Sequence, residues 1–92
     1  MTQWSLYLVR TRSGALYTGI TTNVARRFAE HQSGGVRAAR SLRGKGPLTL
    51  AFQETIGNRT RAAQLEYALK QWPRQRKEAL VAGRIRLQDI ET

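Results

Sequence analysis

The chain has no cysteine, which removes disulfides, thiolate metal ligands and cysteine nucleophiles together. It also lacks any apolar run approaching the roughly 18 residues that a membrane span needs. The opening residues Thr2, Gln3 and Trp4 do not form the basic stretch and apolar segment of a secretion signal. We therefore expect a cytoplasmic protein with an ordinary hydrophobic core. Its 92 residues contain no internal repeat and predict one domain over residues 1–92.

Acidic residues are scarce. Six Asp and Glu stand against sixteen Lys and Arg, and the net charge is +10. Thirteen of the cations are Arg, whose planar guanidinium binds phosphate through paired hydrogen bonds. This excess predicts a nucleic-acid partner, and association with the nucleoid if that partner is DNA. Codon bias in a GC-rich genome would explain Arg in place of Lys, but not the net charge. Size and Arg content alone also suit a ribosome- or RNA-associated structural protein.

Three segments have the pattern of β-strands. Residues 4–9 and 15–20 are β-prone and flank Ser13 and Gly14, which predicts a β-hairpin. Residues 48–53 alternate apolar and polar side chains, which predicts a third, half-buried strand.

A first helix is predicted from Thr22 to about Gln32, because Val24 and Phe28 are spaced i, i+4. Arg27 and His31 lie on the neighbouring stripe of this helix, so we expect them at the edge of the core. The candidate N-caps are Thr21 and Thr22. Residues 33–47 follow as a basic loop without a single acid, which we expect to be flexible.

Two more helices are predicted after Gly57. The first has Asn58 or Thr60 as its cap and ends at Pro73, and the second continues through Val81 to a stop at Gly83. The apolar positions of the first, at helical spacing, are Ala62, Leu65, Leu69 and Trp72. Residues 83–92 form a tail that is either a short strand or an irregular docking segment. The order β-β-α-β-α-α predicts an α+β fold, with a small antiparallel sheet covered by helices.

Leu6-Tyr7 in the first strand and Tyr17-Thr18-Gly19 in the second stand where GIY-YIG nucleases carry their two signature tripeptides. Arg27 and His31 on the first helix, and Glu66 on the second, follow the order and approximate spacing of that family's functional residues. The chain therefore resembles the small stand-alone bacterial members of the GIY-YIG superfamily over about residues 4–82.

The match has two departures. The first tripeptide reads Ser5-Leu6-Tyr7 and the second Tyr17-Thr18-Gly19, so both tyrosines and the final glycine are kept while the Gly-Ile pair and the middle Ile are not. Many family members also carry an Asn about a dozen residues after the glutamate, whereas Asn58 is the last Asn of this chain.

The resemblance implies a metal-dependent DNA endonuclease with one Mg²⁺ or Mn²⁺. Glu66 would hold the metal, since Mg²⁺ binds through one or two carboxylates together with water and phosphate. Arg27 would grip the phosphate with a charge that needs no proton transfer. Tyr7 would act as the general base, Tyr17 would position phosphate or water, and His31 would accept a proton or bind phosphate near neutral pH.

Each of these residues also has a structural alternative. Glu66 and Lys70 are spaced i, i+4, and as a surface ion pair they would contribute only about 0.3–0.5 kcal/mol. Tyr7 and Tyr17 suit the core of a sheet, and His31 suits the C-terminal end of a helix, where it interacts with the helix dipole.

The length of the hairpin loop separates these alternatives for the two tyrosines. A three-residue loop with Gly14 left-handed pairs Tyr7 with Gly19 and puts Tyr7 and Tyr17 on one face of the sheet. A two-residue loop would put them on opposite faces. In the first register, we expect the missing side chain of Gly19 to leave space for a phosphate or a water beside the Tyr7 phenol.

The basic loop is predicted to supply affinity for DNA rather than catalysis. The residues predicted to contact nucleic acid are Gly19, Arg37, Arg40, Arg43, Lys45 and Lys70. Branched or single-stranded DNA in repair or recombination is the implied substrate, and RNA stays an alternative. The rival hypothesis is a DNA- or RNA-binding module that keeps this fold without catalysis.

Overall fold

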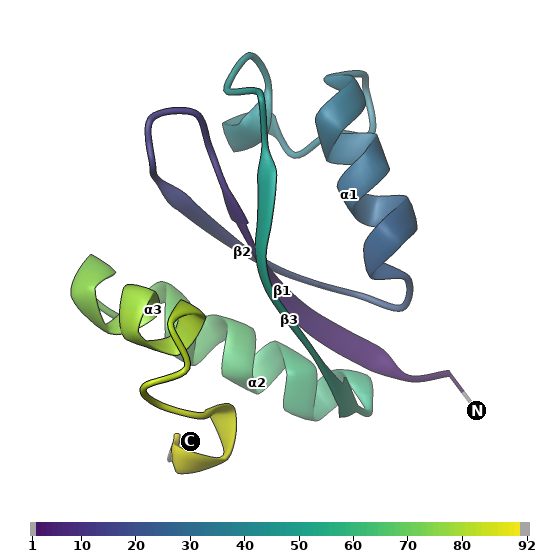
Figure 1. Cartoon of the computed structure of the whole chain (residues 1–92). Coiled ribbons are helices and arrows are strands. Elements are labelled where there is room, and N and C mark those ends of the chain that lie inside the picture. The colour runs from purple at the N-terminus through teal and green to yellow at the C-terminus, as the bar shows by residue number, and fades with distance from the viewer. Residues whose placement is uncertain (1, 91–92) are drawn as a thin grey trace.

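A computed structural model describes residues 2–90 of the chain, and a three-stranded antiparallel sheet lies at its centre (Figure 1). The strand order is β2-β1-β3. The strands are β1 (Trp4–Arg10), β2 (Leu16–Thr21) and β3 (Thr49–Gly57), and the helices are α1 (Val24–Ser33), α2 (Arg59–Lys70) and α3 (Arg74–Val81). Short 3₁₀ turns, η1 (Arg40–Leu42) and η2 (Leu87–Asp89), complete the structure. The predicted α+β class and the order β-β-α-β-α-α are confirmed.

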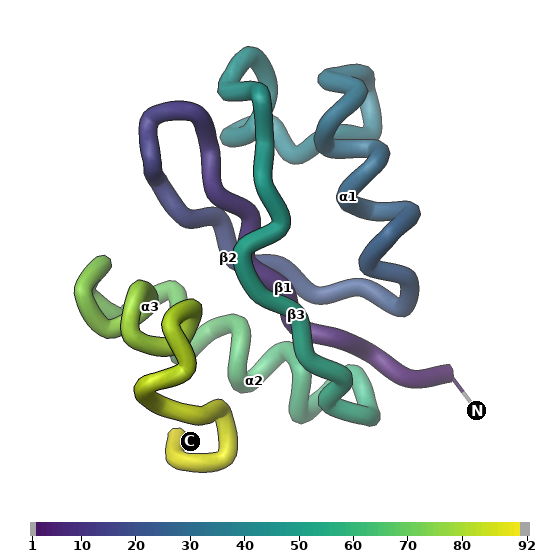
Figure 2. The backbone as a smooth tube through the Cα atoms, in the orientation of Figure 1, coloured from purple at the N-terminus to yellow at the C-terminus, as the bar shows by residue number. Residues whose placement is uncertain are grey.

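The central strand β1 contributes to two hydrophobic cores, because alternate side chains of a strand point to opposite faces. Leu6 and Leu8 pack with α2, α3 and the C-terminal segment. Tyr7 and Val9 pack with residues of α1 and of the loop that follows it. Figure 2 shows the same division, with α1 on one side of the sheet and α2 and α3 on the other. The two predicted tyrosines lie on the α1 side.

The hairpin has the three-residue loop that the active-site hypothesis requires. Gly14 has a φ of 94°, and the Thr11 amide donates to the Ala15 carbonyl over 2.9 Å. The strands then pair Tyr7 with Gly19. The predicted register is confirmed, and Tyr7 and Tyr17 share one face.

Strand β3 differs from the prediction in length and in regularity. It extends to Gly57, and its pairing with β1 shifts so that Val9 lies opposite Leu50 and Leu8 opposite Phe52. Ala51 is therefore an extra residue, as in a β-bulge. The alternation of residues 48–53 predicted one buried face. This is wrong, because the bulge sends Leu50 to the α1 side and Phe52 to the α2 side.

The N-cap of α1 is Asn23, whose Oδ1 accepts from the Arg26 amide over 3.0 Å, so the prediction of Thr21 or Thr22 is wrong. Thr21 Oγ1 instead accepts a hydrogen bond from the Asn23 amide over 3.2 Å, which helps to hold the capping residue Asn23 in position. The cap of α2 is Asn58, one of the two predicted candidates. Its Oδ1 accepts from the Arg61 amide over 2.8 Å.

The basic loop after α1 is held in place by side chains of that helix, so the expectation of a flexible connector is corrected. Gln32 bonds both to the amide and to the carbonyl of Leu48, over 2.9 Å and 3.1 Å. The loop also forms η1 and buries Leu42 and Leu48 against Tyr7 and Val9. Its charged residues thus project from a defined backbone.

The C-terminal segment docks onto the core without adding a strand to the part of the sheet that the structure describes. Leu87 and Ile90 are buried beside Leu6 and Leu8. Of the two alternatives for residues 83–92, the irregular docking segment is therefore confirmed over residues 83–90, whereas 91 and 92 lie outside the described residues. No helix within residues 2–90 is long and apolar enough to cross a membrane.

Candidate active site

Tyr7 and His31 form a buried pair at the centre of the α1 side of the sheet. Each is 1% exposed, and Tyr7 Oη lies 2.8 Å from His31 Nε2. On the other side of the imidazole ring, the Ala39 amide donates to Nδ1 over 3.2 Å. His31 is more deeply buried than Val24 and Phe28, which are only partly buried, so its predicted place at the edge of the core is wrong. Both nitrogens of the ring are engaged.

Gly19 lies directly beneath the Tyr7 phenol. A Cβ atom at this position would lie 2.6 Å from Tyr7 Oη and 2.7 Å from Cζ, closer than real Cβ atoms come to other atoms. The space opposite Tyr7 therefore holds the phenol itself, rather than standing open for a phosphate or a water as we expected. Gly19 seats the ring, and its contact with nucleic acid stays a prediction.

Tyr17 and Arg27 surround this pair. The centroid of the Tyr17 ring lies 6.4 Å from the centroid of the Tyr7 ring and 5.4 Å from that of the His31 ring. Arg27, on α1, donates from Nη1 to Glu30 Oε1 over 2.9 Å and to the carbonyl of Arg37 in the loop. Its positive charge also acts on the Tyr7 hydroxyl and opposes the rise of its pKa. Four of the predicted residues thus meet at one place.

The electrostatics of the pair keep both groups neutral near pH 7. Burial raises the pKa of Tyr7 to about 12, with Tyr17 and Glu66 acting in the same direction and Arg27 opposing them. Burial lowers the pKa of His31, and the positive charge of Arg27 lowers it too, whereas Glu30 opposes both effects. The Tyr7 phenol therefore keeps its proton in the free protein.

Glu66 lies on α2, which packs against β2 and the other strands. Its negative charge contributes to the raised pKa of Tyr7, with a smaller effect than burial or Tyr17. The carboxylate also lies 3.4 Å from Lys70 Nζ, which is the surface ion pair that the spacing suggested. Such a half-exposed pair is weak and readily rearranged.

A metal ion would depend on Glu66 as its protein ligand. Among residues 2–90, no group of three or more His, Cys, Asp or Glu could hold a metal ion. A single partly exposed carboxylate fits Mg²⁺ or Mn²⁺, which take their remaining ligands from water and phosphate. It does not fit zinc, which needs three or four protein ligands.

The loop residues predicted to bind nucleic acid are all exposed or partly exposed: Arg37, Arg40, Arg43 and Lys45. Arg37 is 80% exposed at its side chain and lies 3.7 Å from Glu30 Oε2. Arg43 donates from Nη2 to the Val36 carbonyl over 2.9 Å. Lys70, on α2, is exposed beside Glu66. Arg37 therefore lies beside Glu30, the partner of Arg27, and Lys70 lies beside Glu66.

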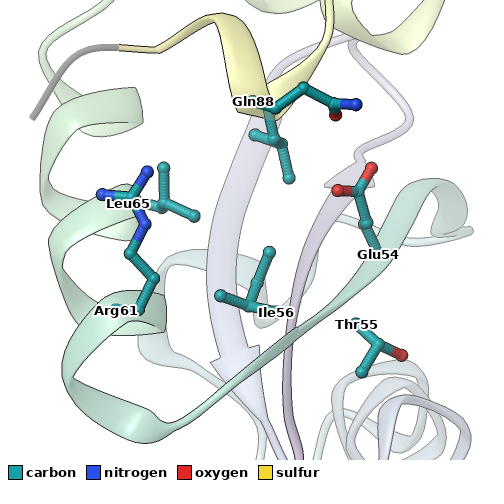
Figure 3. Close-up of a pocket in the computed structure, with 7 residues that line it drawn as sticks. Glu54, Thr55, Ile56, Arg61, Leu65 and Gln88 are labelled. Carbon is teal, nitrogen blue, oxygen red and sulfur yellow. The ribbon is translucent and has the colours of Figure 1, made fainter.

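Sequence analysis missed two groups that hold the site. Glu30 binds Arg27, and the i, i+3 spacing of the two residues on one helix was the available signal. The Ala39 amide binds His31, but a backbone group in a loop leaves no signal in the sequence. A pocket of about 170 Å³ lies elsewhere, between β3, α2 and the C-terminal segment, and none of its lining residues was predicted for the site (Figure 3).

A three-stranded sheet with paired tyrosines, followed by a helix with Arg27 and His31, is what the resemblance to GIY-YIG nucleases predicted. The family model described as the GIY-YIG catalytic domain matches residues 3–79, and the chain belongs to this family.

Relatives of similar size lie in several bacteria. A UPF0213 protein of Photorhabdus laumondii subsp. laumondii is 60% identical over 79 residues, covering 86% of this chain and 74% of that protein. The UPF0213 protein YhbQ of Salmonella typhimurium is 55% identical over 84 residues, covering 91% and 82%.

Solved structures also match the fold. The solution NMR structure of a protein from E. faecalis is 30% identical, with a TM-score of 0.62, covering 90% of this chain and 86% of that one. The solution NMR structure of a UPF0213 protein from Bacillus halodurans is 35% identical, with a TM-score of 0.56, covering 87% and 83%.

Proposed function

We propose that this protein is a metal-dependent DNA endonuclease that hydrolyses phosphodiester bonds with one Mg²⁺ or Mn²⁺ at Glu66. The observation that carries the proposal is the convergence of Tyr17, Arg27 and His31 on Tyr7, within electrostatic reach of Glu66. Weakly specific or structure-directed cleavage of branched or single-stranded DNA in repair or recombination is part of the proposal. The net charge of +10 supports a nucleic-acid substrate.

Arg27 is suited to neutralise charge on the non-bridging phosphate oxygens. Both of its bonds to Glu30 and to the Arg37 carbonyl start from Nη1, whereas a guanidinium has five N–H donors. The residue is thus fixed by its neighbours and still able to donate to a phosphate. Preorganised donors of this kind stabilise a transition state because they need no rearrangement as charge develops.

Tyr7 is suited to act on the attacking water, with Tyr17 beside it to orient the water or the phosphate. To act as a base, the phenol must first release its own proton to the surrounding water. With a pKa of about 12, it does so near pH 7 only when nearby positive charge lowers that pKa, and Arg27 supplies part of this charge. A metal bound at Glu66 would supply the rest, and it would also polarise the phosphate and stabilise the leaving oxygen.

A non-catalytic DNA- or RNA-binding module on the same fold is the second candidate. The ion pair between Glu66 and Lys70 favours it, because the pair engages the only carboxylate proposed for the metal. The two candidates differ in what Glu66 does. As a metal ligand it is essential for cleavage, and as a surface ion pair it is dispensable.

The test is cleavage of single-stranded, duplex and branched DNA by the purified protein with Mg²⁺, with Mn²⁺ and with a chelator. We expect metal-dependent cleavage that falls by orders of magnitude in Glu66→Gln, while DNA binding stays level or tightens slightly because a negative charge is lost. Lys70→Gln is the matched control, since it breaks the ion pair and keeps the carboxylate. Equal cleavage by the wild type and Glu66→Gln, or cleavage that persists in chelator, would favour the binding module.

Arg27→Ala tests the proposed role of Arg27 in neutralising charge on the phosphate. It removes a phosphate contact that strengthens in the transition state, so cleavage falls on the order of 100-fold or more, by analogy with the removal of oxyanion donors, and binding weakens modestly. A loss of binding as large as the loss of cleavage would instead assign Arg27 to ground-state affinity.

A further inference from the structure

We propose that His31 is a fixed hydrogen-bond donor to the Tyr7 oxygen, and that the backbone amide of Ala39 in the basic loop sets this direction. His31 is thereby a positioning residue for Tyr7 and not the base that removes its proton. The inference extends the proposed function, but the hydrogen bonds on which it rests are present whether or not the protein cleaves DNA.

The direction follows from the chemistry of the two ring nitrogens. A backbone amide only donates, so His31 Nδ1 must offer a lone pair to the Ala39 N–H at 3.2 Å. A neutral imidazole has one lone pair and one N–H, so the proton lies on Nε2. Nε2 lies 2.8 Å from Tyr7 Oη and therefore donates to it.

The doubly protonated ring is disfavoured at the same place. In an imidazolium, Nδ1 would also carry a proton, and two N–H donors would face each other at Ala39. The ring is also only 1% exposed, so a positive charge on it would be poorly solvated. Among the charged groups near the ring, Arg27 opposes a positive charge and Glu30 favours it, and the rings of Tyr7 and Tyr17 face the imidazole. The neutral form with a proton on Nε2 is the arrangement that satisfies both bonds.

This direction changes the role that the sequence suggested for His31. Nε2 has no lone pair with which to accept the phenol proton, so the proposed proton acceptor is corrected to a donor. The Tyr7 hydroxyl hydrogen is left to point away from His31 and away from Arg27, which has only donors, and towards Tyr17 or a bound substrate. As negative charge grows on the Tyr7 oxygen, the bond from Nε2–H strengthens.

The same chain of bonds ties the basic loop to the site. Ala39 directly precedes η1, and Arg40 and Arg43, predicted to touch phosphates, lie within four residues of it. The loop lies beside α1 in Figure 1, and Arg27 donates to the carbonyl of Arg37 in it. Backbone groups of the loop therefore bond to both His31 and Arg27.

Long-range ¹H–¹⁵N NMR of the free protein tests the assignment directly, because His31 is the only histidine of the chain. At pH 7 we expect the pattern of a neutral ring with Nε2 protonated. Tyr7→Phe should leave that tautomer in place and shift the Nε2–H proton, since its acceptor is lost. A ring protonated on Nδ1, a tautomer average or an imidazolium at pH 7 would overturn the proposal.

Ala39→Pro and Ala39→Gly separate the amide from the rest of the loop. Ala39 has a φ of −58°, within the range of proline, so Ala39→Pro deletes the N–H at a compatible backbone angle, and Ala39→Gly keeps the N–H. We expect Ala39→Pro to release the ring into a mixture of tautomers, and Ala39→Gly to keep Nε2–H. An unchanged tautomer in a folded Ala39→Pro would overturn the role of the amide. If Ala39→Pro does not fold, the wild-type and Tyr7→Phe spectra still decide the direction of the bond.

The kinetics of DNA cleavage test whether the Ala39 amide matters for the proposed reaction. Ala39→Pro should lower kcat by roughly 3- to 10-fold, the value of one hydrogen bond, and leave KM near that of the wild type, because the loop cations are retained. A loss confined to KM would assign the amide to loop structure alone. Absence of cleavage in the wild type would refute the proposed function and leave the NMR result standing.

Discussion

Gly19 lets the Tyr7 ring lie across β2, and this close approach predicts the effect of the smallest substitution. In Gly19→Ala the new methyl would fall 2.6 Å from Tyr7 Oη, so the ring must move and its bond to His31 must lengthen or break. We expect a loss of about 1–3 kcal/mol in the free energy of unfolding and a severe loss of cleavage. Urea denaturation and a cleavage assay measure the two effects.

Gly35→Ala is the matched control, because a Cβ there meets Ser33 Oγ at an ordinary 3.6 Å. It should change neither stability nor cleavage appreciably. A Gly19→Ala protein as active as Gly35→Ala would show that the Tyr7 ring does not need its present position.

His31 also makes stability depend on pH. Its pKa is lowered by burial in the folded state from an ordinary 6.5, so the unfolded chain binds the proton more tightly. Stability is therefore lost as the pH falls below 6.5, with a slope that approaches at most about 1.4 kcal/mol per pH unit. The lowered pKa values of Glu30 and Glu78 act only below about 4.5, so the range from pH 7 to pH 5 isolates the histidine.

Urea denaturation across this range should show the slope in the wild type, and His31→Gln should remove it. A wild-type stability that is flat from pH 7 to pH 5 would contradict a buried neutral histidine.

Which residues face each other across the hairpin could be predicted from the sequence, because strand period and loop length fix the register. The burial of His31 could not. Its helical position is compatible with both the edge and the centre of the core, and the loop that covers it contributes a backbone amide. The role of Gly19 was likewise hidden, since only the side chain of Tyr7 shows what occupies the space.

At the scale of the elements, the loop between α1 and β3 presents its cations from a fixed backbone. Arg40 and Lys45 make no side-chain hydrogen bond that holds the described loop together, so replacing both with Gln should remove charge without unfolding it. For duplex DNA, each phosphate that the protein no longer touches should lower the steepness of log K against log salt by about 0.9. The double variant should therefore reduce the slope by up to about 1.8, twice that value.

Lys77 and Arg84, on α3 and just beyond it, form the matched pair, because their replacement lowers the net charge by the same amount on the other side of the sheet. We expect this second double variant to change the slope much less. Equal changes in the two variants would show that binding depends on net charge and not on the loop.

Helices and strands were predictable where one periodicity dominates, as in α2 with its buried Ala62, Leu65 and Leu69. Prediction failed where a single residue alters the pattern. Because Ala51 is an extra residue in β3, Leu50 and Phe52 on either side of it lie on opposite faces of the sheet. Asn23 outcompetes two threonines as the cap of α1, in line with the preference for Asn at this position.

At the scale of the whole molecule, the core extends beyond the segment that matches the family. That match ends at residue 79, yet Leu87 is 2% exposed and packs with Leu6, Leu8 and Leu69. We expect Leu87→Ala to lower the free energy of unfolding by about 2–5 kcal/mol, the usual range for a buried leucine. Denaturation in urea measures the change.

The exposed neighbour Gln88 supplies the comparison, and Gln88→Ala should cost less than about 0.5 kcal/mol. Cleavage by the folded fraction should be unchanged in both variants, because Leu87 packs with core leucines and with none of the candidate site residues. A Leu87→Ala protein as stable as the wild type would place the C-terminal segment outside the cooperative unit.

Tyr7 belongs to the packed interior and to the candidate site at once. Selection for folding alone is enough to retain its ring over long evolutionary times, so the presence of an aromatic residue at this position says nothing about chemistry. Only the hydroxyl oxygen distinguishes selection for folding from selection for chemistry, because packing needs the ring alone. In a comparison of natural variants, chains that carry Phe here would have kept the fold without the proposed reaction, and chains that keep Tyr together with His31 and Glu66 would have kept both.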